Sequence, residues 1–114
     1  MLLRDIAHAR TGDKGDRTTL SVIAMDARHF PLLEKMLTPE RVRAQYEGLV
    51  QGAIDRYGLA QLGALNFVLH GALGGGVTRS LALDAHGKCL ASGLLGLRLS
   101  DDEAAEARLP RVSP

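Results

Sequence analysis

Two stretches of this 114-residue chain combine glycines with charged side chains, which are the residue types of anion-binding sites. They read ARTGDKGDR at residues 9–17 and HGALGGGVTRS at residues 70–80. Glycine backbone approaches a ligand closely, its free N–H groups bind phosphate or carboxylate, and arginine adds two parallel hydrogen bonds. We therefore predict a ligand-binding site composed of Arg10, Gly12, Asp13, Lys14, Gly15, Asp16, Asn66, His70, Gly74, Gly75, Gly76, Thr78 and Arg79.

The prediction that the ligand is an anion depends on the cationic side chains of this set. We expect Arg79, directly after the triple glycine, to be the main anion contact, with Arg10 and Lys14 adding positive charge. The aspartates of residues 9–17 hold those cations in place or bond their own backbone in a turn. The alternative for the second stretch is a strained hairpin in which Arg79 pairs with Asp84.

Two histidines are weak candidates for catalysis. His8 and His70 each lie where a predicted strand meets a glycine stretch, a position suited to a general acid or base. A simple hydrogen bond at the strand end is the commoner role of such a residue. They lack a third ligand at a suitable spacing, so we predict no metal site, and no cofactor is expected. The sequence also lacks the Gly-Lys-Ser/Thr signature of nucleotide-hydrolysing loops.

Composition narrows the function classes. A hydrophobic content of 46% and a length of 114 residues predict one domain with its own core. The net charge of +1 and 4% aromatic residues argue against nucleic acid and against an anionic membrane as partners. The single cysteine forms no internal disulfide. We expect a cytoplasmic protein, because the first ten residues carry charges where a signal peptide is apolar.

Periodicity predicts the elements that must position these residues. Apolar alternation indicates about six short strands, and caps and apolar stripes indicate two helices after the second strand, from Pro31 and from Pro39. A capping box at Ser100 to Glu103 predicts a short last helix. This pattern favours an α+β fold, an antiparallel sheet with helices on one face. The expected strands include 2–8, 18–25, 54–57, 64–69 and 89–99, the last after a tight hairpin at 84–88.

Both glycine stretches also point to a family. The segments IAHARTGDKGD and GALNFVLHGALGGGVTRSLALDAHGK resemble the small ferredoxin-like domain of the AtuA family, named for acyclic terpene utilisation. The resemblance implies a domain at residues 1–99. The short C-terminal helix and loose tail expected at 100–114 lie outside the resemblance. In that family the domain forms the C-terminal part of a larger AtuA protein or a separate chain, and this sequence resembles the separate form. The ferredoxin-like label applies loosely, because residues 84–88 leave room only for a hairpin before the last strand.

Three functions remain open at this point. The resemblance implies an accessory or binding module that pairs with a larger AtuA-type protein and holds an anionic metabolite, such as an acyl-CoA. A small hydratase or lyase using His8 or His70, with Arg79 as the anion clamp, is the second. A structural oligomerisation module is the third. We also expect a homo-oligomer when the larger partner is absent, because an open sheet leaves edges that need cover.

Overall fold

The fold is a four-stranded sheet with helices on one side. The computed structural model of the protein describes residues 1–14, 17–46, 50, 52–70, 91 and 93–108. Short 3₁₀ turns at Leu3–Asp5, Ala27–His29 and Ala60–Leu62 connect the larger elements. The strands are β1 (Ala7–Lys14), β2 (Arg17–Ala24), β3 (Ile54–Leu59) and β4 (Ala64–His70), and the helices are α1 (Phe30–Met36), α2 (Pro39–Gln45) and α5 (Asp101–Arg108).

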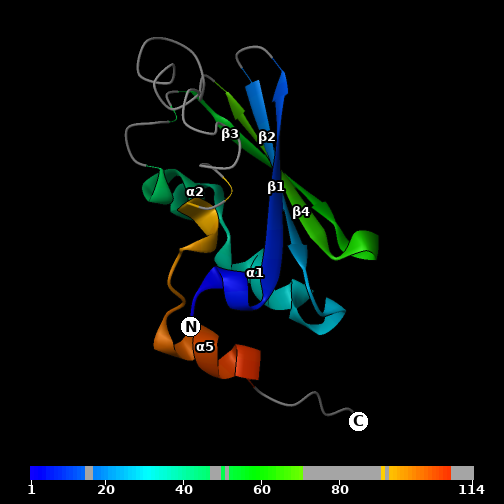
Figure 1. Ribbon diagram of the computed structural model, residues 1–114, viewed down its shortest axis with the longest axis vertical. Coiled ribbons are helices and arrows are strands. Elements are labelled where there is room, and N and C mark those ends of the chain that lie inside the picture. Colours follow the sequence, from blue (N-terminus) through cyan, green and yellow to red (C-terminus); the bar gives the residue numbers. More distant parts are fainter. Residues whose placement is uncertain (15–16, 47–49, 51, 71–90, 92, 109–114) are drawn as a thin grey trace.

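The strand order in the sheet is β1-β2-β4-β3, and every neighbouring pair is antiparallel. The chain leaves the sheet after β2, forms α1 and α2, and returns through β3 at the far edge before β4 fills the centre. Both helices lie on the same side of the sheet (Figure 1). This arrangement confirms the predicted α+β class, and the fold is ferredoxin-like in the loose sense.

Alternation along the central strands decides which face the helices cover. Successive side chains of a strand point to opposite faces, so one face collects the apolar set. Leu20 and Val22 of β2 are fully buried, whereas Thr19, Ser21 and Ile23 between and beside them are only half-buried. In β4 the same pattern buries Leu65, Phe67 and Leu69. These side chains pack with Leu33, Leu37 and Val42 from the helical layer in one core.

Helix α2 begins as its cap predicts. The Thr38 hydroxyl accepts a hydrogen bond from the Arg41 backbone N–H, and Pro39 takes the first turn of α2, where no intrahelical donor is needed. Arg56 of β3 donates to the carbonyls of Glu34 and Leu37, at 2.7 and 3.0 Å. The sheet thereby satisfies carbonyls at the C-terminal end of α1 that the helix itself leaves unbonded.

The C-terminal helix α5 is joined to the rest of the domain. Its capping box forms as predicted: Ser100 Oγ accepts from the Glu103 N–H, and Glu103 Oε1 accepts from the Ser100 N–H. Arg41 binds both carboxylate oxygens of Glu103 and also donates to the Arg98 carbonyl. Ala104 and Ala107 are buried against this layer. One arginine therefore joins α2, the segment before α5 and α5 itself.

The predicted first strand at residues 2–8 is wrong in its position. Residues Leu3–Asp5 form a 3₁₀ turn, and the strand begins at Ala7. Leu3 and Ile6 are both buried, a spacing of three residues that a turn, unlike a strand, places on one side. The Asp5 carboxylate also accepts a bond from the Leu2 N–H at 2.8 Å and holds the turn closed.

The predicted polar loop at residues 9–17 is largely strand. β1 continues to Lys14 and pairs with β2 along its whole length, ending at the pair of Lys14 with Arg17. β1 lies at an edge of the sheet, where polar side chains remain in water, so its polarity does not prevent strand pairing. Thr11 and Gly12, residue types that are common in turns, are part of this polar edge strand.

The predicted last strand at residues 89–99 is also wrong. Residue 91 and residues 93–95 are helical, and strand-like pairing is limited to one bridge between Leu2 and Arg98. Gln45 at the end of α2 donates to the Gly93 carbonyl at 2.7 Å, and a side chain on Gly93 would lie 3.3 Å from the Tyr46 ring. Packing against α2 decides the conformation of this short apolar run, which periodicity leaves ambiguous. The predicted hairpin at 84–88 lies outside the described residues.

Candidate functional site

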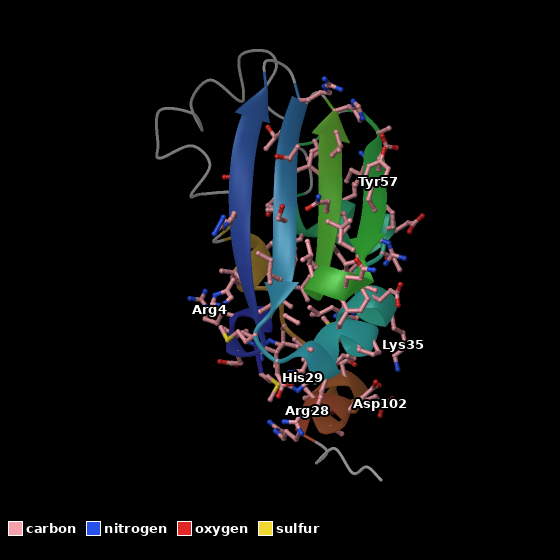
Figure 2. The ribbon with its side chains drawn as sticks, turned by 90° about the vertical axis from the view of Figure 1, so that its right-hand side faces the viewer. Arg4, Arg28, His29, Lys35, Tyr57 and Asp102 are labelled. Atoms are coloured by element: carbon pink, nitrogen blue, oxygen red, sulfur yellow. The ribbon has the colours of Figure 1, made fainter. Side chains whose placement is uncertain are left out.

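The candidate site is the open face of the sheet, the face opposite α1 and α2. Figure 2 views this face, with the four strands standing in front of the helices. The register places the residues that alternate with the core on this face in rows across the strands. The open face consists of His8, Arg10 and Gly12 from β1; Arg17, Thr19, Ser21 and Ile23 from β2; Ala64, Asn66, Val68 and His70 from β4; and Asp55, Tyr57 and Leu59 from β3.

Five residues that the sequence singled out lie together on this face. They come from both glycine-containing regions and the strands beside them, so the antiparallel register brings distant parts of the chain onto one surface. Two rows contain three of them: one pairs Arg10 with Ser21 and Ser21 with Asn66, and another pairs Arg17 with His70. The five residues are His8, Arg10, Gly12, Asn66 and His70.

Arg10 and Arg17 are the free cations of this surface. Both are exposed, and neither forms a hydrogen bond or ion pair with any described residue. Arg41, Arg43 and Arg56 differ, because each donates to backbone carbonyls and joins structural elements. A guanidinium without an internal partner keeps its five donors available to a carboxylate or phosphate. The sequence prediction included Arg10 but missed Arg17. The signal was present, because Arg17 lies two residues before Thr19 and therefore on the same face of β2.

His70 is paired with Asp55 on the neighbouring strand. The distance from His70 Nε2 to Asp55 Oδ2 is 2.9 Å, and 36% of the histidine side chain and 47% of the aspartate side chain are exposed. A carboxylate that accepts from one ring nitrogen fixes the orientation of the imidazole and leaves the other nitrogen for another partner. The sequence prediction missed Asp55. Its partner His70 lies on the neighbouring strand β4, and the sequence does not specify that β3 and β4 pair.

The backbone of His70 is fixed from both sides. Its N–H donates to the Ala53 carbonyl at 3.0 Å, and its carbonyl accepts from the Gly52 N–H at 2.8 Å. A Cβ atom on Gly52 would lie 2.5 Å from the His70 oxygen, so only glycine allows this approach. Arg43 of α2 donates to the Gly52 carbonyl at 2.6 Å. The end of α2 thus supports the strand end at which His70 lies.

Asn66 finds its partner on the same face. Ser21 Oγ donates to Asn66 Oδ1 at 2.7 Å, which satisfies the need for a partner that an asparagine inside an apolar strand predicts. Because the oxygen accepts this bond, the amide nitrogen of Asn66 is the group that can donate outward. Tyr57, next to Asn66 in the register, is 54% exposed on the edge strand (Figure 2). This row offers hydrogen-bond donors from β1 to β3.

Gly12 has a packing reason to be glycine. The Thr19 hydroxyl donates to the Gly12 carbonyl at 3.3 Å, and a Cβ on Gly12 would lie 2.9 Å from that hydroxyl oxygen.

Asp13 and Lys14 form the end of β1. The remaining predicted site residues, and with them the meeting of the two glycine stretches, lie outside the described residues: Gly15, Asp16, Gly74, Gly75, Gly76, Thr78 and Arg79.

Two classes of feature are absent from the part of the chain that the structure describes. Within these residues no group of three or more histidine, cysteine, aspartate or glutamate side chains is arranged to hold a metal ion. None of the described helices has the length and apolar character needed to cross a membrane.

Comparison with known proteins assigns the chain to a family. Searches of curated proteins and of solved structures give no significant match. The model of the AtuA ferredoxin-like domain matches residues 1–100, which include all four strands and both helices that cover the sheet. The chain therefore belongs to the AtuA ferredoxin-like domain family.

Proposed function

We propose that this protein is a binding module that pairs with a larger AtuA-type protein and holds an anionic metabolite of the acyl-CoA class. The observation that carries the proposal is the position of Arg17, an exposed guanidinium without a described partner, directly beside His70. β4 ends at His70, where the glycine stretch with Thr78 and Arg79 begins. A cation at that point supplements the positive charge of Arg79 for a phosphate or carboxylate.

The charge balance of the open face supports an anionic ligand. Arg10 and Arg17 are unpaired among the described residues, and the single acid of the face, Asp55, is bonded to His70. Exposed cations that lack partners attract anions at long range and bind them at short range. The strands hold the backbone of these residues in place, so the entropy cost of binding at this face is mainly that of ordering the arginine side chains, about 0.5–1.5 kcal/mol each.

A thermal-shift assay tests ligand binding. Coenzyme A, acyl-CoAs, inorganic phosphate and short carboxylates are the probes, and a ligand at a hundredfold excess over its Kd stabilises the native state by about 2.7 kcal/mol. We expect Arg17→Ala and Arg79→Ala to remove the shift, and Arg79→Lys to restore part of it. Arg108→Ala is the matched control, because Arg108 is an exposed arginine at the end of α5. Shifts in all four variants equal to that of the wild type would contradict the proposal.

The His70–Asp55 pair favours one alternative, a small hydratase or lyase. An oriented imidazole beside an anion-binding arginine is a workable general base. In this reading water adds across the double bond of an unsaturated acyl-CoA, and the loss of enoyl absorbance reports the reaction. His70→Gln should abolish that activity, whereas a binding module shows no turnover with any variant.

The third candidate, an oligomerisation module, rests on the sheet edges. β1 and β3 lie at the two edges of the described sheet, where strands offer unpaired backbone groups to another chain. Self-association in the absence of the larger partner therefore stays a prediction, which sedimentation tests.

A further inference from the structure

The open face carries an apolar patch that the proposed anion site does not use. Its members lie in adjoining rows of the register: Ile23 pairs with Ala64 and Ala64 with Leu59, and Val68 and Tyr57 follow on the same face. Tyr57 is 54% and Leu59 is 38% exposed. Leu62, in the turn that joins β3 to β4, is 69% exposed. We define the apolar patch as Ile23, Tyr57, Leu59, Ala64 and Val68.

This patch is separate from the core. Ala64 is almost fully buried, yet neither it nor Ile23, Val68 or Leu59 belongs to the hydrophobic cluster between the sheet and the helices. No described element lies over this face (Figure 2). Large aliphatic and aromatic side chains gathered on an exposed surface mark an interaction site more often than singly exposed ones do.

The charged side chains of this face that have no described partner are basic. On the β1 and β2 side the face carries His8, Arg10 and Arg17, none of which has a described partner. On the β3 side Asp55 is engaged by His70. An apolar centre with arginine and tyrosine beside it is the composition of a protein interface, in which these two residue types supply much of the binding energy.

We infer that the open face docks a protein whose contact surface has an apolar centre and carboxylates where it meets β1 and β2. The apolar patch supplies the buried centre, and Arg10 supplies charge-assisted hydrogen bonds at the basic side. This inference rests on the proposed function, because the larger AtuA-type protein is the partner proposed there. To the proposed pairing the inference adds the surface of this chain that docks, the orientation of the partner with its carboxylates toward β1 and β2, and the negative charge of the partner there.

Two other occupants fit the face less well. A second copy packed face to face brings the unpaired guanidiniums of both copies to one interface, with a single carboxylate per copy that is already engaged. Single-stranded RNA binds open sheets by stacking bases on aromatic rings, and Tyr57 is the sole aromatic residue among the described members of this face.

The test measures the affinity of this chain for a larger AtuA-type protein, used as the purified probe. The variants are the double substitution Tyr57→Ser with Leu59→Ser, and Arg10→Glu. Arg108→Glu is the control, since it makes the same charge change at an exposed arginine of α5. We expect each open-face variant to weaken binding at least tenfold and the control to bind as the wild type does. Circular dichroism and melting curves verify that every variant is folded.

The possible outcomes distinguish an error in the docking surface from an error in the proposed function. Binding that all variants retain overturns the open face as the docking surface and leaves the proposed pairing intact. A wild-type chain that does not bind the larger protein overturns both. A wild-type dimer that the open-face variants dissociate, or binding of a single-stranded RNA oligomer that Arg10→Glu abolishes, assigns the face to another occupant and overturns the inference.

Discussion

His70 Nε2 lies 2.9 Å from Asp55 Oδ2, across the central strand β4 and the edge strand β3. The pair is half-exposed, and its histidine is the last residue of the strand that leads into the glycine stretch. A structural role would require the pair to contribute to stability, whereas a functional role requires only that the imidazole be oriented. Exposed pairs contribute little to stability, so the stability of a variant that lacks the pair distinguishes the two roles.

We expect Asp55→Asn to change the free energy of unfolding by less than about 1 kcal/mol, because solvent screens an exposed pair. The same substitution should weaken ligand stabilisation measured by thermal shift, since the imidazole loses the carboxylate that orients it. Urea unfolding of the free protein measures the first effect. A loss of stability well above that limit would make the pair a structural contact.

Gly52→Ala should destabilise the protein by about 1 to 3 kcal/mol, because the new Cβ atom would lie 2.5 Å from the backbone oxygen of His70. The backbone cannot yield without breaking the bond between the Gly52 N–H and the His70 carbonyl. Gly58→Ala is the control, since its Cβ would find its nearest neighbours at 3.8 and 3.9 Å. Chemical denaturation of both variants tests the difference. Equal stabilities of Gly52→Ala and Gly58→Ala would show that Gly52 does not approach the His70 backbone this closely in solution.

Self-association should be measured with the isolated chain. The edge strands β1 and β3 predict a dimer or larger species in light scattering when no partner is present. A species that stays strictly monomeric at tens of micromolar would remove the prediction and favour the separate binding module.

The sequence was informative where local chemistry determines structure. Thr38 and Pro39 fixed the start of α2, and Ser100 with Glu103 fixed the start of α5, since each cap satisfies donors within one turn. Alternation identified β2 and β4 because one of their faces is buried in the core. The α+β class followed from these elements.

Local chemistry was insufficient where distant contacts decide. Arg17 and Asp55 entered the site because strand register placed them beside His70, and register depends on pairing between segments far apart in the sequence. Residues 93–95 became helical through contacts with Gln45 and Tyr46 at the end of α2. Gly12 looked like part of a ligand loop because its packing partner, Thr19, lies on the next strand.

Glu103 predicts how the attachment of α5 depends on pH. The hydrogen bonds from Arg41 lower the pKa of Glu103 below its ordinary value of 4.5. A carboxyl whose pKa is lower in the folded than in the unfolded protein stabilises the fold above the unfolded pKa. That contribution is lost as the pH falls through the folded pKa. The side chains of Glu103 and Arg41 are 17% and 30% exposed, so solvent screens this pair only in part.

We therefore expect Glu103→Gln to lower the free energy of unfolding at pH 7 by about 2 kcal/mol, the scale of a hydrogen bond to a charged group. The difference from the wild type should shrink as the pH falls below 4.5, because the carboxyl of the unfolded chain then binds a proton before that of the folded protein, and it should vanish once the folded carboxyl is protonated too. Glu106→Gln is the control, since Glu106 lies on the same helix as Glu103 and pairs with Lys35 of α1, with 41% of the Glu106 and 64% of the Lys35 side chain exposed. Its effect should stay below about 1 kcal/mol at every pH. A gap between Glu103→Gln and the wild type that is constant from pH 7 to pH 3 would show that the carboxylate charge does not hold α5 in place.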